Sequence, residues 1–234
     1  MNRVTALVIG VLVSAGAFAQ PQKVLNLPNF DKKWVHFGFT LGINNMNYRK
    51  DTDLTAVDSL ISLETAAQPG FHIGIVSQVN MSPLFSVRFL PALAFGQRNL
   101  EYIFQGETRN ISETKAVEST YLEFPLLFKY RSTRANNFAA YFVGGVKYAA
   151  DLSSQEEINN NVPPPQQVVR LRRHNFMYEI GFGVDFFLEY FKLSPEIKVS
   201  TGINDVFIDE NTLWERPIDR LVPRVITFSL HFEG

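Results

Sequence analysis

Hydrophobic and polar residues alternate with a period of two along most of this chain. From Val35 to Ile43 the odd positions carry Val, Phe, Phe, Leu and Ile, and the even positions carry His, Gly, Thr and Gly. A period of two is typical of β-strands whose two faces meet different surroundings. The alternation recurs along the chain and predicts eight β-strands, at residues 35–44, 71–80, 85–96, 122–130, 141–151, 178–186, 192–200 and 226–232.

The predicted strands have the length and the two faces of membrane-crossing strands. Most are about 9 to 14 residues long, close to what a tilted strand needs to cross a bilayer. One face carries Phe, Leu, Ile and Val, and the other carries Gly, Ala, Ser and polar residues. A soluble lipocalin-like barrel would turn the bulky face inward and overfill an eight-stranded interior. We therefore expect the bulky face to lie against lipid.

The connections between the predicted strands alternate in length. Four gaps are roughly twenty residues long and three are tight, and this alternation is typical of outer-membrane barrels, whose short turns lie in the periplasm. The long gaps are Arg49–Pro69, Gln97–Ser119, Leu152–His174 and Ile203–Leu221, and the short ones are Met81–Leu84, Arg131–Asn137 and Leu188–Phe191. The predicted fold class is all-β: an eight-stranded antiparallel transmembrane β-barrel of outer-membrane type, with long extracellular loops and short periplasmic turns.

The first residues have the pattern of a cleavable secretory signal peptide. Arg3 precedes an apolar stretch at Val4–Val13, and Ala17-Phe18-Ala19 forms a cleavage site of small residues. The apolar stretch is too short to span a bilayer as a helix. We therefore expect a signal peptide at residues 1–19, a periplasmic tether at residues 20–34 and a barrel at residues 35–234, located in the outer membrane of a Gram-negative bacterium.

Composition narrows the classes of function. The chain has no cysteine, which excludes disulfides, thiol catalysis and thiolate metal sites. Its net charge is −1, so no global positive field exists to collect the phosphates of a nucleic acid. The mean hydropathy is near zero, which excludes a multi-helix membrane protein but suits a barrel with one apolar and one polar face.

Ionisable residues gather on the face that is predicted to line the lumen. They are His36, His72, Arg88, Glu123, Lys129, Lys147, Asp151, Glu179, Asp185, Lys192, Glu196, Lys198 and His231. The basic and acidic members nearly balance, and an isolated buried charge is strongly destabilising. We therefore expect a network of paired side chains that fills the barrel, with a catalytic or conducting arrangement as the alternative.

The sequence gives no support for catalysis. No G-x-S-x-G, H-E-x-x-H or phosphate-cradling glycine loop occurs. A lipid-modifying barrel would need a serine, a histidine and a carboxylate at one rim. Three of the four histidines fall on the predicted lumen face, and His174 lies at a loop edge. We expect no enzyme activity, no cofactor, no metal and no small-molecule substrate.

Eight aromatic residues lie near the ends of predicted strands. Tyr and Trp are enriched where a membrane protein meets the interface between lipid and water. We expect interfacial girdles formed by Trp34, Tyr48, Tyr102, Tyr121, Tyr130, Tyr141, Tyr190 and Trp214.

The segment before the first strand is too polar for a strand and too short for a domain. It would serve as a tether, as a contact for a periplasmic partner, or as a plug that returns into the barrel mouth. The candidate residues for a partner contact are Asn26, Leu27, Pro28, Phe30 and Asp31.

The same segment carries a resemblance to a known family. Asn26–Lys33, followed by His36–Asn44 and Met46, is similar to the opening of the PorT family. The resemblance extends along the mature chain and includes Gly144–Tyr148, Asp151-Leu152 and Ser194–Lys198. A PorT-type protein is an outer-membrane β-barrel accessory of the type IX secretion system, which exports proteases and gliding-motility adhesins.

This resemblance implies a role in protein secretion as an assembly or stability component. The expected partners are other secretion-system proteins in the outer membrane or periplasm, and outer-membrane lipid. An eight-stranded barrel with a filled lumen cannot pass a folded protein, so we do not expect the chain to be the conduit. The alternatives are a generic small barrel that stabilises the envelope or docks at the surface, and a lipid-modifying barrel enzyme.

Overall fold

A computed structural model describes residues 25–57, 59–106, 110–156, 163, 167–209, 212 and 214–234. The strands are β1 (Val35–Thr52), β2 (Leu60–Asn80), β3 (Phe85–Phe89), β4 (Ala92–Phe104), β5 (Ile111–Arg131), β6 (Phe138–Asp151), β7 (His174–Phe187), β8 (Lys192–Gly202) and β9 (Ile218–Glu233). Two short 3₁₀ helices, η1 (Phe30–Lys32) and η2 (Leu54–Ala56), accompany them. Within this described part of the chain, no helix is long and apolar enough to cross a membrane.

The predicted signal peptide, residues 1–19, lies outside the described residues, as does the start of the predicted tether, residues 20–24. Both stay predictions. The division of the chain into a signal peptide, a tether and a barrel also stays a prediction.

The strands close into an antiparallel barrel. β1 pairs with β2 on one side and with β9 on the other, so that Phe39 lies opposite both Ile75 and Phe232. Every other neighbouring pair around the ring is also antiparallel. The predicted fold class is confirmed.

The nine strands of the described chain occupy eight positions around the barrel, called here staves. β3 and β4 together occupy one of them. Both lie between β2 and β5, separated only by Leu90 and Pro91. Proline cannot donate to a ladder, which interrupts the regular pairing. The pairing nevertheless continues across the interruption, since Leu90 N donates to Pro125 O at 3.2 Å and Ile75 N donates to Pro91 O at 2.9 Å.

The two faces of the barrel differ as the alternation predicts. Side chains such as Phe37, Ile73 and Phe128 point outward and are exposed, whereas His36 and Arg88 point inward and are buried. A soluble barrel would have the opposite arrangement, and monomeric soluble proteins rarely expose a continuous apolar surface of this size. The apolar outer surface is therefore a surface for lipid. It is called here the apolar belt and is formed by the exposed outward side chains of the strands, among them Phe37, Ile73 and Phe128.

Several strands run farther than the alternation predicts. β2 and β5 are each 21 residues long, and most of the predicted loops Arg49–Pro69 and Gln97–Ser119 consists of strand. Beyond the belt the outer face no longer meets lipid, so the contrast between faces disappears from the sequence while the backbone pairing continues. Thr65, Leu100 and Lys115, for example, lie opposite one another on three successive strands. The predicted loop boundaries were wrong here.

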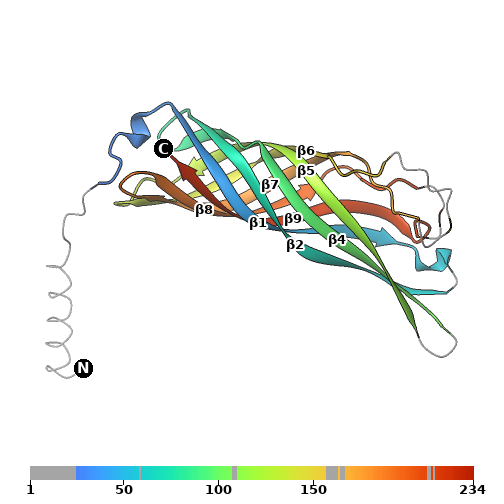
Figure 1. The fold of residues 1–234 in the computed structure, drawn as a ribbon. Helices are drawn as coiled ribbons and strands as arrows, with labels where there is room; N and C mark the ends of the chain where they lie inside the picture. Colours follow the sequence, from blue (N-terminus) through green and yellow to red (C-terminus); the bar gives the residue numbers. More distant parts are fainter. Residues whose placement is uncertain are drawn as a thin grey trace, which may run out of the picture.

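The two ends of the barrel differ in their connections. The segment with η1 and the C-terminus lie at the same end (Figure 1), and the three short turns, residues 81–84, 132–137 and 188–191, belong to that end as well. At the opposite end, the β6–β7 and β8–β9 connections span residues 152–173 and 203–217. The β1–β2 and β4–β5 connections at that end are short, because those strands run farther. By the rule for outer-membrane barrels, the end with the short turns is periplasmic and the other is extracellular.

The apolar belt generates a first prediction. Ile180 is exposed at the middle of the outward face of β7, so Ile180→Arg should lower the free energy of unfolding by about 2–4 kcal/mol. Ser112→Arg, on the exposed β5 extension, should cost about 0–1 kcal/mol because it stays in water. Urea unfolding from phospholipid vesicles measures both. Equal costs would contradict a membrane-facing belt.

Candidate functional site

The lumen is filled by charged side chains, and Arg88 lies at the centre of the periplasmic half. Its guanidinium contacts Glu196 at 3.2 Å and Glu233 at 3.1 Å. It also donates to Gln78 Oε1 at 3.2 and 2.9 Å. All the side chains in these two ion pairs are fully buried. Four strands, β2, β3, β8 and β9, are thus connected through one arginine.

A second group of ion pairs adjoins this arginine. Lys129 Nζ contacts both carboxylate oxygens of Asp185 at 2.8 Å. Lys192 Nζ lies 3.0 Å from Glu233 and 4.0 Å from Asp185. Ser194 Oγ donates to Asp185 at 2.6 Å. Because each carboxylate contacts two or more donors, the cost of burying its charge is offset.

A third group fills the middle of the lumen. Lys147 Nζ contacts Glu123 at 2.7 Å and Glu179 at 3.1 Å, and Lys198 Nζ contacts Glu179 at 3.0 Å. Ser200 Oγ donates to Glu179 at 2.5 Å. These side chains come from β5, β6, β7 and β8, so the group links four neighbouring strands.

The histidines and Asp151 complete the set of predicted lumen residues. His231 Nε2 lies 3.4 Å from Glu196, and His72 Nε2 lies 3.3 Å from Ser229 Oγ. Asp151 accepts from the backbone N–H groups of Thr120 and Ser153 at 3.2 and 3.0 Å. A void of about 20 Å³ beside His72 and His231 is close to the space that one water needs.

Two charged residues of this lumen were absent from the predicted set. Alternate residues of a strand face inward, and by this alternation Glu233 faces the lumen like His231, and Arg98 faces it like Arg88. The parity of either strand would have identified them, but Arg98 lies in a segment that was interpreted as a loop. Arg98 donates to Tyr48, and to Tyr121 at 3.0 Å. It closes the extracellular half of the lumen with aromatic rather than acidic partners.

The aromatic girdle prediction was wrong for most of its members. Trp34, Tyr130 and Tyr190 are exposed, at 71%, 51% and 85%. The other five point inward and are buried, namely Tyr48, Tyr102, Tyr121, Tyr141 and Trp214. The physical reason is that the interior cations need partners: Arg98 lies over the rings of two of these tyrosines, and Lys129 Nζ lies 3.7 Å from the ring centroid of a third.

A hydrophobic cluster, called here the outer cap, closes the extracellular end. The Tyr102 hydroxyl donates to the Trp214 carbonyl at 2.7 Å, and the two rings meet edge to face at 5.1 Å. Lys115 Nζ lies 4.4 Å from the centroid of the Trp214 ring. The buried members are Tyr48, Leu60, Leu63, Leu100, Tyr102, Val169, Leu171, Val206, Phe207, Trp214, Ile218 and Leu221.

The segment before β1, called here the mouth segment (residues 25–34), folds against the periplasmic mouth. Phe30 is buried and stacks on His36 with ring centroids 3.8 Å apart. Lys192 Nζ lies 4.7 Å from the Phe30 ring, and Phe187 packs edge-on against that ring at 5.8 Å. The phenyl ring therefore covers the charged side chains that lie nearest the periplasmic mouth of the lumen.

Polar contacts hold the mouth segment to the turn between β5 and β6. Asp31 contacts Arg131 at 2.8 Å. The Asn26 N–H donates to Asn137 Oδ1 at 2.9 Å, and Arg134 donates to the Asn26 carbonyl. Of the five candidate partner-contact residues, only Pro28 is exposed, while Asn26, Leu27, Phe30 and Asp31 lie against the barrel's own mouth.

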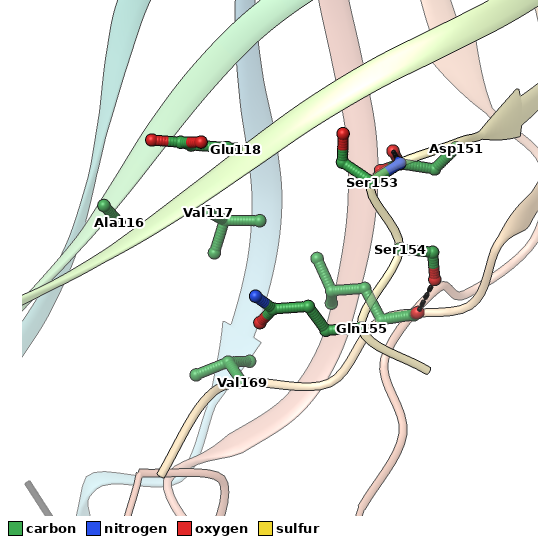
Figure 2. Close-up of a pocket in the computed structure, with 9 residues that line it drawn as sticks. Ala116, Val117, Glu118, Asp151, Ser153, Ser154, Gln155 and Val169 are labelled. Carbon is green, nitrogen blue, oxygen red and sulfur yellow. Dashed lines mark hydrogen bonds between the residues drawn. The ribbon is translucent and has the colours of Figure 1, made fainter. Parts of the chain in front are cut away.

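An extracellular recess of about 250 Å³ lies between the β5 extension and the chain that follows β6. Figure 2 shows Glu118 and Val117 on one side, and Ser153, Ser154 and Gln155 on the other. Ser154 Oγ donates to the Leu171 carbonyl at 3.1 Å, which ties the two sides of the loop together. The recess is smaller than a typical ligand pocket.

Two histidines contact hydroxyl groups on other strands. The Ser229–His72 contact is buried inside the lumen, where no lipid substrate reaches it. His174, at the extracellular rim, contacts the Tyr148 hydroxyl at 2.7 Å. Across the described ranges, no cluster of three or more histidine or acidic side chains is placed to hold a metal ion.

The buried ion pairs generate a second prediction. Asp185→Asn should lower the free energy of unfolding by about 3–5 kcal/mol, because it leaves Lys129 buried without its counter-charge. Glu64→Gln is the matched control, since Glu64 pairs with Lys50 at 3.3 Å but its side chain is 68% exposed. This control should cost about 0–1 kcal/mol. Urea titration compares the two, and a small loss for Asp185→Asn would show that the network does not hold the barrel.

The mouth segment generates a third prediction. Phe30→Ala should speed trypsin cleavage after Lys32 and Lys33 by about tenfold or more, because the segment loses its buried anchor. Asn29→Ala is the control, since Asn29 is exposed and its side chain makes no capping bond. Mass spectrometry of the released peptides follows both rates. Unchanged cleavage in Phe30→Ala would mean that the ring does not anchor the segment.

Comparisons with known proteins agree with this architecture. OprG from Pseudomonas aeruginosa is similar in structure, at 14% identity over 86% of this chain and 95% of that chain, with a TM-score of 0.50. Ail of Yersinia pestis, solved with the heparin analogue sucrose octasulfate, has 11% identity over 86% of this chain and 100% of that chain, with a TM-score of 0.42. No curated protein matches the sequence.

The family assignment comes from the sequence itself. At 14% identity the likeness to OprG shows the fold alone. The family described as "Outer membrane protein beta-barrel domain" matches residues 18–208, which is more than half of the chain. This chain therefore belongs to the outer membrane protein β-barrel domain family.

Proposed function

We propose that this outer-membrane barrel is an accessory component of the type IX secretion system that supports export through protein contacts. The resemblance of Asn26–Lys33 and His36–Asn44 to the PorT family supports the choice of system. The filled lumen supports the choice of role. A protein that cannot conduct its cargo contributes to export by binding and stabilising the components that do.

The single observation that carries this role is the continuous filling of the lumen. Buried ion pairs occupy its periplasmic half and its middle, and the outer cap and the mouth segment close its two ends. Channels that pass large solutes need about sixteen or more strands. Eight staves filled with side chains leave no path for a polypeptide.

The proposed contacts use the surfaces that the barrel's own packing leaves free. On the periplasmic side, Pro28, Lys32 and Lys33 of the mouth segment are exposed. On the extracellular side, the extended β4–β5 hairpin projects beyond the apolar belt (Figure 1). Because Phe30 and Asp31 bind the barrel itself, they hold the mouth segment in place while its outer residues meet a partner.

A small structural barrel is the second candidate function. The family match and the likeness to OprG favour it, because both describe outer-membrane barrels in general. In this case the chain would stabilise the envelope or dock at the surface, without a role in secretion.

A clean deletion of the gene separates the two candidates and is a fourth prediction. In the deletion strain, cargo with type IX sorting domains should accumulate in the periplasm and disappear from the culture supernatant. Quantitative proteomics of the two fractions measures this, and a complemented strain should restore the wild-type distribution.

Envelope integrity is the control for this experiment. Detergent sensitivity should stay at the wild-type level in the deletion strain. Normal secretion with a leaky envelope would overturn the secretion role and favour the structural barrel.

A further inference from the structure

Two arginines project outward from the barrel wall beyond the extracellular edge of the apolar belt. On β9, Arg224 follows the outward parity of Ile226 and Phe228, and all three are exposed. On β1, Arg49 continues the outward parity of Ile43 and is also exposed. Both arginines therefore face the surroundings of the barrel and not its lumen.

The strand register places these two arginines close together on one face. Arg224 lies opposite Asn47, and Arg49 lies opposite Val222, so the arginines are diagonal neighbours across the β1–β9 pair. Diagonal neighbours on one face of an antiparallel pair are about 7–8 Å apart. Two guanidinium groups on long side chains can therefore converge on one anionic group or on two adjacent ones.

Their height matches the headgroup layer of a bilayer. A strand rises about 3.3 Å per residue at a tilt of about 40°, so Arg224 lies roughly 5 Å beyond Ile226 along the barrel axis. The polar headgroup layer begins at the same boundary, where the apolar side chains end. Arg49 lies one diagonal step farther out.

In the part of the chain that the structure describes, neither arginine forms an ion pair. Within the described residues, no carboxylate lies within 4.0 Å of Arg49 or Arg224, whereas Arg88 and Arg131 each contact an acidic side chain. The outward neighbours of Arg224 are uncharged: Asn47 lies opposite it on β1, and Thr201 lies opposite it on β8. Asp51 is the next outward residue after Arg49 on β1 and lies opposite Arg220, so three arginines and one carboxylate share this face and it keeps an excess of positive charge.

The two arginines and their polar and apolar neighbours match the chemistry of a lipid in the outer leaflet. Guanidinium groups match phosphate oxygens in a two-pronged geometry. Asparagine and threonine offer hydrogen bonds to sugar hydroxyls, and the apolar side chains below offer a wall for acyl chains. We propose that Arg49 and Arg224 bind the phosphate groups of a phosphorylated glycolipid of the outer leaflet, whose acyl chains lie against Ile43, Ile226 and Phe228.

Binding of bisphosphorylated lipid A to the purified full chain tests this site. Native mass spectrometry in detergent gives the apparent affinity. The double variant R49Q/R224Q should bind at least about tenfold more weakly, because it loses charge-assisted hydrogen bonds to phosphate. K32Q/K33Q is the matched control: it removes two exposed positive charges at the opposite end and should bind like wild type.

The comparison of ligands identifies what the site recognises. Lipid A without phosphates, phosphatidylglycerol and inorganic phosphate should each bind wild type far more weakly than bisphosphorylated lipid A does. Equal binding of phosphatidylglycerol would overturn the glycolipid assignment in favour of anionic lipid in general. If inorganic phosphate bound wild type as tightly as bisphosphorylated lipid A does, the glycolipid assignment would also be overturned, because the arginines would then attract any anion.

Two further controls keep the result interpretable. Urea unfolding confirms that R49Q/R224Q is folded before it is scored. If that variant does not fold, R49K/R224K keeps the charge but removes the two-pronged donor geometry, and it should bind several-fold more weakly. Wild-type affinity in a folded variant would overturn the proposal.

Discussion

Pairing of buried charge inside a narrow ring of strands is the constraint on which the rest of this structure depends. Arg88, Lys129 and Lys147 lie in the lumen and are almost fully excluded from solvent, where an unpaired charge would destabilise the fold by several kcal/mol. Each has an acidic partner on another strand, so the network ties the staves together across the interior. The same network fills the lumen between the outer cap and the mouth segment.

The sequence predicted the fold because the bilayer imposes a contrast between the two faces of each strand. Wherever lipid touches one face, parity alone assigns each residue to the belt or the lumen, as it does for Phe228 and His231. Beyond the belt both faces meet water or protein, and the contrast is lost. The extensions of β2 and β5 could therefore not be recognised as strand. Arg98 has the inward parity of β4, but it lies in such an extension, where the sequence pattern predicts a loop. The inward tyrosines were predicted wrongly because their positions near strand ends indicate an interfacial girdle, whereas their parity indicates the lumen.

The position of the mouth segment could not be predicted from its own residues. Asn26, Phe30 and Asp31 are ordered by partners a hundred or more residues away, at Asn137, Phe187 and Arg131. Together with the outer cap, this segment turns a filled cylinder into one that is closed at both ends. The surfaces that remain exposed are the periplasmic face of the mouth segment, the extracellular strand extensions and the wall that meets lipid.

Electrical conductance across a planar lipid bilayer tests the closed lumen most directly. Purified wild-type protein inserted in molar KCl should give no stable current steps, since ion pairs and the two caps occupy the whole path. A large porin inserted under the same conditions provides the positive control. Stable unitary steps from the wild-type barrel would contradict a filled lumen and reopen a transport role.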